Sequence, residues 1–496
     1  MKRKTSGEGT EQVPGPLRRI LPLVFLTLLL LALAVPAGLV IASAFTDSSG
    51  SGDSAASVPP WQQLPATLAA GSGNAAGIQP LTQAAPVPEP GALAAQLNET
   101  LKPDGAGTFA GVVQDAATGK LLFDRAGDQA VVPASNMKLL TAAAALRTLG
   151  PDRRFSTRVV AGSNPGTVVL VGGGDVLLGA GESAPDAVLG HAGLATLAQS
   201  TVRALQQDGV SGPVTVLLDD SLFTGPTLNP AWNMEDVAAG ETAPLFPLAL
   251  SSARFDPAKT TGPRPQDAAL HAAEAFAGQL AAAGAPAGLT VAPGVARGSA
   301  AAGSARDARV LAEVQSATVA QQADLLLETS DNYLAEVVGR MTALASGKPA
   351  SNDGAVAAVL QQLAEMGVGT GTLRAADVSG LALGDQVSVH LLADVVRTIT
   401  SGPDPRLRSA LAGFPVAGLT GTLADRYLDA STARGAGVVR AKTGTLNAVL
   451  ALSGYVVDAD GRLLVFSFVG NGLTPGAANK TALDRTASVL AGCGCR

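Results

Sequence analysis

The chain has 496 residues, with 34 Lys and Arg against 40 Asp and Glu, which gives a formal net charge of -6. This length is enough for two domains. The acidic balance, without a basic patch interleaved with aromatic residues, argues against nucleic-acid binding by bulk electrostatics. Aromatic residues make up only 3% of the chain, so its core must consist mainly of leucine, valine and alanine.

Histidine and cysteine are too sparse to favour a metal site. His191, His271 and His390 lie far apart and show no ligand spacing. A Ser-His-Asp triad is not favoured, but it stays open because triad members need not be close in sequence. Cys493 and Cys495 are the only cysteines, and a Cys-x-Cys pair by itself is not a zinc site. Two free thiols and a local disulfide both fit this tail. We therefore expect no metal and no cofactor.

The N-terminal region predicts a membrane segment followed by a linker. Residues 1–19 are polar and positively charged, and residues 20–45 form an almost wholly apolar run that is long enough to span a bilayer. The positive flank predicts a cytoplasmic N-terminus with the remainder outside. A cleaved signal peptide is the alternative, because small residues near the end of the run resemble a cleavage site. Residues 46–91 are rich in Ser, Gly, Ala and Pro and predict a flexible linker.

The folded part is expected to begin at residue 92 and to contain two domains. A helix over 92–101, a hairpin and a helix carrying Ser135 predict an antiparallel sheet with helices against it. Residues 158–300 alternate strand-like runs with Gly-rich turns, and we interpret them as an inserted domain. The first domain would then consist of residues 92–157 and 301–496.

The remaining chain is predicted to return to helices and to end in strands of the first sheet. Helical patterns cover 307–328, 354–365 and 391–399, strand patterns cover 438–445, 448–457 and 463–469, and a closing helix covers 478–490. The turn over 458–461 joins the last two strands as a hairpin.

Ser135 and Lys138 form the first of three short polar patterns. Residues three apart on a helix share one face, so the Ser135 hydroxyl and the Lys138 amine are expected to meet. A serine hydroxyl is a poor nucleophile at neutral pH, and an amine kept neutral by burial can accept its proton. Because Ser-x-x-Lys also occurs by chance on solvated helices, this pattern alone is weak evidence.

The second pattern, Ser-Asp-Asn at 330–332, interrupts two apolar helical runs and predicts a short loop between buried helices. On a loop that faces the Ser135 helix, Ser330 could relay a proton. Asn332 could hold a substrate amide.

The third pattern lies on a predicted strand. Lys442 and Thr443 could offer a positive charge and a hydroxyl to a substrate carboxylate, and Gly444 would leave room for substrate along the strand. The backbone N–H groups of Ser135 and Thr445 would then form an oxyanion hole.

The three patterns together, in this order, are those of penicillin-recognising serine enzymes. The chain resembles the D-alanyl-D-alanine carboxypeptidase/endopeptidase family of low-molecular-mass class C penicillin-binding proteins, the S13 peptidases. The resemblance spans about residues 92–490. The stretches that carry it are 173–175, 218–223, 330–336, 377–381, 421–423 and 442–446.

The resemblance implies an α+β fold of the serine β-lactamase/DD-peptidase type, an antiparallel sheet flanked by helices, with an inserted strand-rich domain. It implies hydrolysis of the terminal D-Ala-D-Ala bond of peptidoglycan stem peptides through an acyl-enzyme on Ser135, outside the cytoplasm. β-Lactams should acylate the same serine, with no cofactor. Asp377 is expected to help shape the substrate cleft, although a plain turn fits the residues there equally well.

Two other functions stay under consideration. A β-lactamase-like hydrolase or esterase would use the same catalytic residues, but the long insertion disfavours it. A non-catalytic cell-wall-binding protein would keep the fold, but the three patterns are intact. The balance between carboxypeptidase and endopeptidase activity is open, because it depends on the shape of the cleft.

Overall fold

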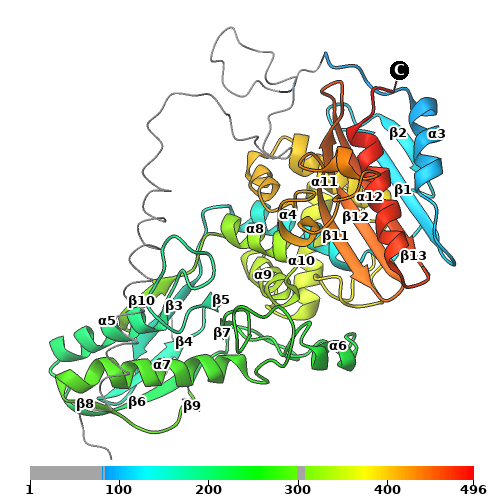
Figure 1. Cartoon of the computed structure of the whole chain (residues 1–496). Coiled ribbons are helices and arrows are strands. Elements are labelled where there is room, and N and C mark those ends of the chain that lie inside the picture. The colour runs from blue at the N-terminus through cyan, green and yellow to red at the C-terminus, as the bar shows by residue number, and fades with distance from the viewer. Residues whose placement is uncertain (1–80, 82–83, 299–307, 496) are drawn as a thin grey trace, which may run out of the picture. The chain divides into compact units, whose positions relative to one another are not determined.

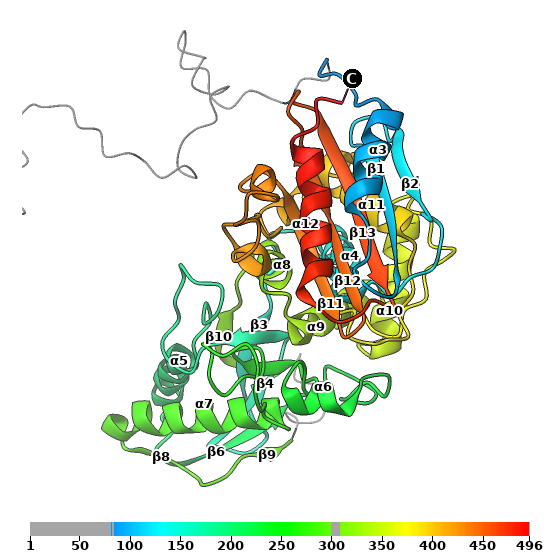
Figure 2. The same cartoon turned by 45° about the vertical axis from the view of Figure 1, so that its right-hand side comes forward.

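The computed structural model describes residues 81, 84–298 and 308–495 (Figures 1 and 2). The predicted membrane segment over 20–45, and the predicted linker up to residue 80, lie outside the described residues. Among the helices of the described part, none is both long and apolar enough to cross a membrane. Helix α3 (Pro90–Thr100) takes the last two residues of the predicted linker, because the Glu89 side chain caps its first turn.

A five-stranded sheet with the strand order β11-β12-β13-β1-β2 is built from both ends of the folded chain. Its strands are β1 (Thr108–Asp115), β2 (Leu121–Arg125), β11 (Arg440–Leu446), β12 (Val449–Val457) and β13 (Leu463–Asn471). All neighbouring pairs are antiparallel, and Thr108 at the start of β1 lies opposite Asn471 at the end of β13. Strand β11 is therefore at an edge, where one side of its backbone is open to other groups.

Helices cover both faces of this sheet, because side chains along each strand alternate between the two faces. On one face, Phe466 and Phe468 share an apolar core with residues of α3 and α12 (Ala477–Ala491), and Figure 2 shows these two helices on that face. On the other face, Val465 and Val469 share a core with the remaining helices. Those helices are α4 (Met137–Leu149), α8 (Val319–Thr329), α9 (Asn332–Ala345), α10 (Asn352–Glu365) and α11 (Val389–Ser401). The predicted α+β fold is confirmed.

A second sheet, with the order β10-β3-β4-β6-β8, is built from residues 156–315, which we call the second-sheet region. Its main elements are β3 (Ser156–Ala161), β4 (Thr167–Val171), α5 (Leu194–Gln207), β6 (Gly212–Asp219), α7 (Ala268–Gly284), β8 (Leu289–Val291), β9 (Ala296–Arg297) and β10 (Val310–Gln315). Smaller elements are β5 (Asp175–Leu178), α6 (Met234–Ala239) and β7 (Leu248–Leu250). Helices α5 and α7 share an apolar core with this sheet. The sheet extends beyond the predicted bounds of 158–300 at both ends.

The start of the predicted helix over 307–328 is wrong. Residues Val310–Gln315 form strand β10, which pairs with β3 in antiparallel register. Helix α8 begins only at Val319, because Thr318 and Gln321 form a reciprocal capping box that defines its N-terminus. Burial alternates from residue to residue along β10, which is the period of a strand and not that of a helix.

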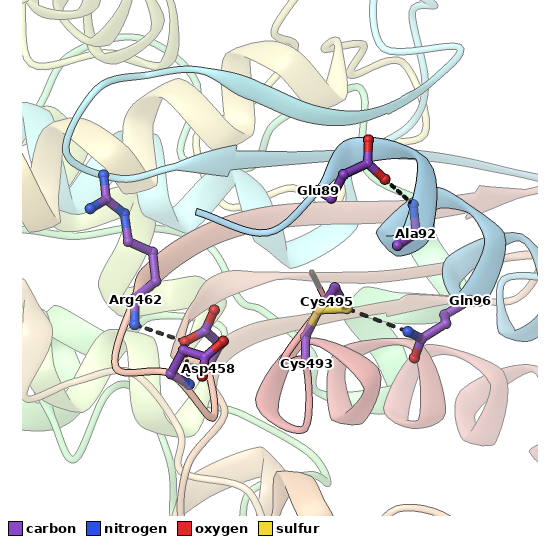
Figure 3. The surroundings of a disulfide bond; sticks show 8 residues. Glu89, Ala92, Gln96, Asp458, Arg462, Cys493 and Cys495 are labelled. Carbon is purple, nitrogen blue, oxygen red and sulfur yellow. Dashed lines mark hydrogen bonds between the residues drawn. A yellow bond between two sulfur atoms is a disulfide. The ribbon is translucent and has the colours of Figure 1, made fainter. Parts of the chain in front are cut away.

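The C-terminal tail ends in a disulfide between Cys493 and Cys495, so the second of the two expectations for these cysteines applies (Figure 3). The Glu89 amide donates a hydrogen bond to the Cys495 carbonyl at 2.7 Å, and the Gln96 amide nitrogen lies 3.4 Å from Cys495 Sγ. These contacts hold the tail against the beginning of α3.

Candidate active site

Ser135 lies in a short 3-10 turn, Ala134–Asn136, which runs directly into α4, so the serine stands at the beginning of the helical segment. Ala134 has a φ of 50°, a conformation that costs a non-glycine residue about 1–3 kcal/mol and is concentrated at functional sites. The helix that follows is buried from Met137 to Leu146. Ser135 itself is only partly buried, so its hydroxyl is reachable while its support is rigid.

Lys138 is fully buried behind Ser135, and its ammonium or amine group has three partners. Its Nζ lies 3.0 Å from Ser135 Oγ, 2.6 Å from Asn332 Oδ1 and 2.7 Å from the Ser379 carbonyl. Burial lowers the pKa of Lys138 to about 8, although the charge of Asp377 and other nearby carboxylates opposes the shift. A useful fraction of the neutral amine is therefore present near neutral pH.

The loop at 330–332 is held from several sides. Ser330 has a φ of 60°, and its Oγ accepts a hydrogen bond from Lys442 Nζ at 2.9 Å. Asp331 caps the first turn of α9 with its carboxylate. Asn332 donates through Nδ2 to the Glu241 carbonyl at 3.0 Å while its Oδ1 faces Lys138. The loop thus links the Lys138 helix to the strand that carries Lys442.

Lys442 lies in β11 and is fully buried. It also donates to the Thr443 carbonyl at 2.7 Å. Burial, with a further contribution from the charge of Lys138, lowers the pKa of Lys442 well below its ordinary value. The Thr443 hydroxyl lies 2.7 Å from that of Thr422, so two hydroxyl groups meet beside the strand.

The open edge of β11 presents backbone N–H groups away from the sheet. The Ala441 amide donates to the Pro415 carbonyl, a group outside the sheet. Because successive amides along a strand point in opposite directions, the amides of Thr443 and Thr445 point to the same open side. Ser135 lies near the start of its helical segment, where amides have no partner within the helix. The Thr445 amide therefore points out of the sheet, and the Ser135 amide lies at the beginning of a helical segment.

Gly444 lies where β11 meets the turn that carries Ser135. A Cβ atom there would lie 3.0 Å from both the Ala134 side chain and the Pro133 carbonyl. The missing side chain lets β11 pack closely against the turn that carries Ser135. Gly444 itself is not part of the lining of the cavity described next.

A cavity of about 1100 Å³ brings five of the nine predicted site residues to one surface. These residues are Ser135, Ser330, Asn332, Thr443 and Thr445. Charged residues on its wall are Glu235, Asp236, Glu241, Arg254, Arg264, Asp331, Arg426 and Lys480. Lys138 and Lys442 lie behind this surface and contact it through Ser135 and Ser330. Within the described ranges, no cluster of three or more His, Cys, Asp or Glu side chains is arranged to hold a metal ion.

Asp377 lies behind the wall of the cavity and fixes a turn whose Gly380 and Leu381 line it. Asp377 is fully buried and is not itself part of the cavity lining. Its carboxylate accepts hydrogen bonds from four consecutive backbone amides, residues 379–382, and from Trp232 Nε1 at 2.8 Å. Asp377 thereby fixes the turn whose Ser379 carbonyl accepts from Lys138.

The site also contains Thr422, Glu241 and Arg254, which the sequence alone did not indicate. Thr422 belongs to the stretch 421–423, so the family resemblance was a signal that could have found it. Glu241 contributes a backbone carbonyl and Arg254 an ion pair with Asp331, and neither contact produces a recognisable sequence pattern.

Comparisons with known proteins give a family and a set of relatives. Residues 93–265 and 257–492 match the model of the D-Ala-D-Ala carboxypeptidase 3 (S13) family. A carboxypeptidase of Mycobacterium tuberculosis is 39% identical over 424 residues, which cover 85% of this chain and 88% of the relative. The carboxypeptidase DacB of Mycolicibacterium smegmatis is 36% identical over 460 residues, covering 92% and 94%.

Among solved structures, penicillin binding protein 4 (dacB) from Haemophilus influenzae has the same fold, with a TM-score of 0.63 at 19% sequence identity. The match covers 80% of this chain and 98% of that protein. The family match and the mycobacterial relatives confirm the resemblance that the three motifs predicted, and the chain belongs to the D-Ala-D-Ala carboxypeptidase 3 (S13) family.

Proposed function

We propose that this chain is a serine-type D-Ala-D-Ala carboxypeptidase that acts on peptidoglycan stem peptides through an acyl-enzyme on Ser135. Family membership and two relatives that are named carboxypeptidases support the reaction class. The single observation that carries the assignment of residues is the 3.0 Å contact between Lys138 Nζ and Ser135 Oγ at the wall of the cavity.

In the acylation step, neutral Lys138 accepts the proton of Ser135 Oγ as that oxygen attacks the carbonyl carbon of the penultimate D-Ala. The amides of Ser135 and Thr445 stabilise the oxyanion of the tetrahedral intermediate. The peptide bond breaks, and the amine of the leaving D-Ala takes up the proton that Lys138 had accepted, passed on through the Ser330 hydroxyl, which hydrogen-bonds to Lys442. Lys138 is then neutral again. Water then hydrolyses the ester on Ser135, with Lys138 again as base.

The hydroxyls beside β11 supply recognition of a free C-terminal carboxylate. Thr422 and Thr443 are in mutual contact, and both line the cavity with Thr445. The positive charge of Lys442, when it is protonated, lies behind them. Hydroxyl donors and a nearby cation are suited to a carboxylate, so the leaving group is a terminal D-Ala. Whether the cleft also accepts a cross-linked peptide depends on the length of substrate that it admits.

β-Lactams are expected to acylate the same serine. Penicillin binding protein 4 of Haemophilus influenzae, which shares the fold with a TM-score of 0.55, has been solved in complex with a β-lactam. The alternative of a β-lactamase-like hydrolase differs in the fate of the acyl-enzyme, since it predicts rapid turnover of penicillin. A non-catalytic wall-binding protein predicts no acylation.

We place the catalytic region outside the cytoplasm, where peptidoglycan lies. Residues 20–45 would anchor it as a single transmembrane helix, and residues 46–89 would separate it from the bilayer. The length and apolar character of the first segment and its positive flank support this arrangement. Cleavage as a signal peptide is the alternative, which the mass of the mature protein distinguishes.

Incubation with a defined pentapeptide that ends in D-Ala-D-Ala tests the proposed function. Mass spectrometry should show a product shorter by one alanine, and the same peptide with a C-terminal amide should react far more slowly because it lacks the carboxylate. A cross-linked dimer, assayed in parallel, measures endopeptidase activity. Absence of product from the free pentapeptide, or rapid penicillin turnover, would contradict the proposal.

Gly380→Ala should damage the site through the backbone. Gly380 has a φ of +82°, and an added Cβ would lie 1.9 Å from the Ala134 carbonyl, next to Ser135. We expect a loss of about 2–4 kcal/mol in the free energy of unfolding, from left-handed strain and overpacking. Displacement of the serine turn should also lower the penicillin acylation rate by about 10- to 100-fold.

The matched control for this variant is Gly384→Ala in the same loop, where the nearest atom to an added Cβ is 3.7 Å away. Denaturant unfolding and labelling kinetics should leave this control near wild type. Equal stability and equal reactivity of both alanine variants would show that Gly380 does not hold the serine turn.

A further inference from the structure

A left-handed turn in the second-sheet region carries three consecutive non-glycine residues. Ser251, Ser252 and Ala253 have φ values of 50°, 57° and 55°. Side-chain-bearing residues visit this conformation singly and at a cost, so three in succession persist only where surrounding contacts determine them. Non-glycine residues in the left-handed conformation cluster at functional sites.

Buried hydrogen bonds hold the turn in place. The Ser252 amide donates to the Val176 carbonyl at 2.6 Å, and the Ser251 amide donates to the Leu178 carbonyl at 3.1 Å. From the other side, the buried Arg264 guanidinium donates through Nη1 to the Ser252 carbonyl at 2.9 Å. Arg264 Nε donates to a second carbonyl, that of Gly240, at 2.6 Å. The turn is therefore braced by strand β5 and by a buried cation.

The residue directly after this turn is Arg254, and its side chain contacts Asp331 in the 330–332 loop. Arg254 Nη1 lies 2.7 Å from Asp331 Oδ2, and the Asp331 side chain is only 3% exposed. The other oxygen of Asp331 caps α9. An ion pair with this little exposure is only weakly screened by solvent, and a charge-assisted hydrogen bond at this distance is strong and directional.

The two neighbours of Asp331 are the loop residues that face the reacting groups. Ser330, itself in a left-handed conformation, contacts Lys442, and Asn332 contacts Lys138. A shift of Asp331 would therefore move a proton-relay hydroxyl and a ligand of the general base together. Near-attack geometry is sensitive to displacements of about 1 Å, so the clamp on Asp331 has a kinetic consequence.

We propose that Arg254 is a positioning residue for catalysis, which the left-handed turn presents to Asp331 so that the second-sheet region holds the 330–332 loop in its reactive arrangement. The proposal rests on the proposed acyl-enzyme chemistry at Ser135 and assigns a new part of the chain to it. The second-sheet region then completes the catalytic site in addition to contributing cavity wall.

Penicillin acylation kinetics of the full chain test this role with four variants. Arg254→Ala should lower the second-order acylation rate constant by about 10- to 100-fold, and Arg254→Lys, which keeps the charge, should recover part of the loss. Asp331→Asn can still cap α9 but loses the charge, and it should resemble Arg254→Ala. The control Arg309→Ala removes an exposed arginine of the same region, whose ion pair is with Asp208, and should react as wild type.

The double variant Arg254→Ala/Asp331→Asn separates positioning from general damage. If the pair acts as one unit, the double variant should be no slower than the slower single variant. Fully additive losses would overturn the proposal, as would an Arg254→Ala protein that acylates at the wild-type rate. Should Arg254→Ala fail to fold, Arg254→Lys and Asp331→Asn still decide the question, because each keeps one feature of the pair.

Arg254 lines the cavity, so direct contact with substrate is the competing explanation. If Arg254 acts by positioning, its substitution should lower the acylation rate constant by the same factor for penicillin and for a small neutral D-Ala thioester. KM should change little. A loss confined to one acyl donor, or to KM, would assign Arg254 to substrate binding and overturn the proposal. Failure of wild-type protein to acylate at Ser135 would instead refute the proposed function itself.

Discussion

Ser135→Ala is expected to abolish covalent labelling by a fluorescent penicillin and to lower peptide hydrolysis by at least about 10⁴-fold, because no other group can take the place of the nucleophile. The substitution removes one partly buried oxygen atom and leaves its neighbours in place. Asn136 keeps its hydrogen bond to Ser453 at 2.8 Å, so the turn should retain its shape. Unfolding measurements should therefore show a stability close to that of wild type.

Gel fluorescence and intact-protein mass spectrometry would measure the labelling of this variant. The control is Ser221→Ala, a change to an exposed serine of the second-sheet region that does not line the large cavity. It should label as wild type does. If Ser135→Ala acquired the penicillin adduct at the wild-type rate, another nucleophile would carry the chemistry and the assignment of the site would be wrong.

Lys138→Met should lower the acylation rate on the order of 10³-fold, within the range found for loss of a general base. Methionine roughly conserves the volume of the buried side chain but cannot accept a proton. It also leaves Asn332 Oδ1 and the Ser379 carbonyl without the donor that they share in the structure. Lys120→Met, at an exposed lysine, is the matched control and should be unaffected.

The pH dependence of acylation gives a second readout of Lys138. With a pKa of about 8, roughly one tenth of the amine is neutral at pH 7, against about one in 3000 for an ordinary lysine. Because the neutral form is the base, the rate should rise about tenfold from pH 7 to pH 9, with most of the rise below pH 8.5.

Stopped-flow labelling between pH 6 and pH 9.5 would record this profile. Lys138→Met should show a flat residual rate, since the titrating base is gone. A wild-type rate that is independent of pH over the same range would argue against a neutral lysine as the base, even if Ser135 proved to be the nucleophile.

The sequence by itself determined the parts of the site that depend on local spacing. A separation of three residues was enough to bring Ser135 Oγ and Lys138 Nζ within 3.0 Å, because a helical turn imposes that proximity whatever surrounds it. The polar break at 330–332 between apolar runs likewise predicted a loop between two helices. Alternation placed Lys442 on a strand, and the order of the three patterns identified the family.

Only the tertiary structure decided which groups meet across the chain. The sequence left open whether Asp377 helps to shape the cleft or lies in a plain turn. In the structure its carboxylate is buried against backbone amides and the Trp232 indole, and it fixes a turn whose Gly380 and Leu381 line the cavity. Residues 310–315 had a composition that fits a helix, but they pair with β3 as a strand. The link from Arg254 to Asp331 joins residues 77 positions apart and has no local pattern.

The physical reason is the range of the forces involved. Helical and strand periods, caps and turns are set by neighbours within a few residues, so a sequence records them directly. Burial, pKa and the choice of ion-pair partner depend on which distant segments exclude water from a group. For this protein, local sequence was enough to identify Ser135, Lys138 and the motifs that contain them. The lowered pKa of Lys138 and the ion pair of Arg254 with Asp331 arise only when the two sheets and their helices pack together.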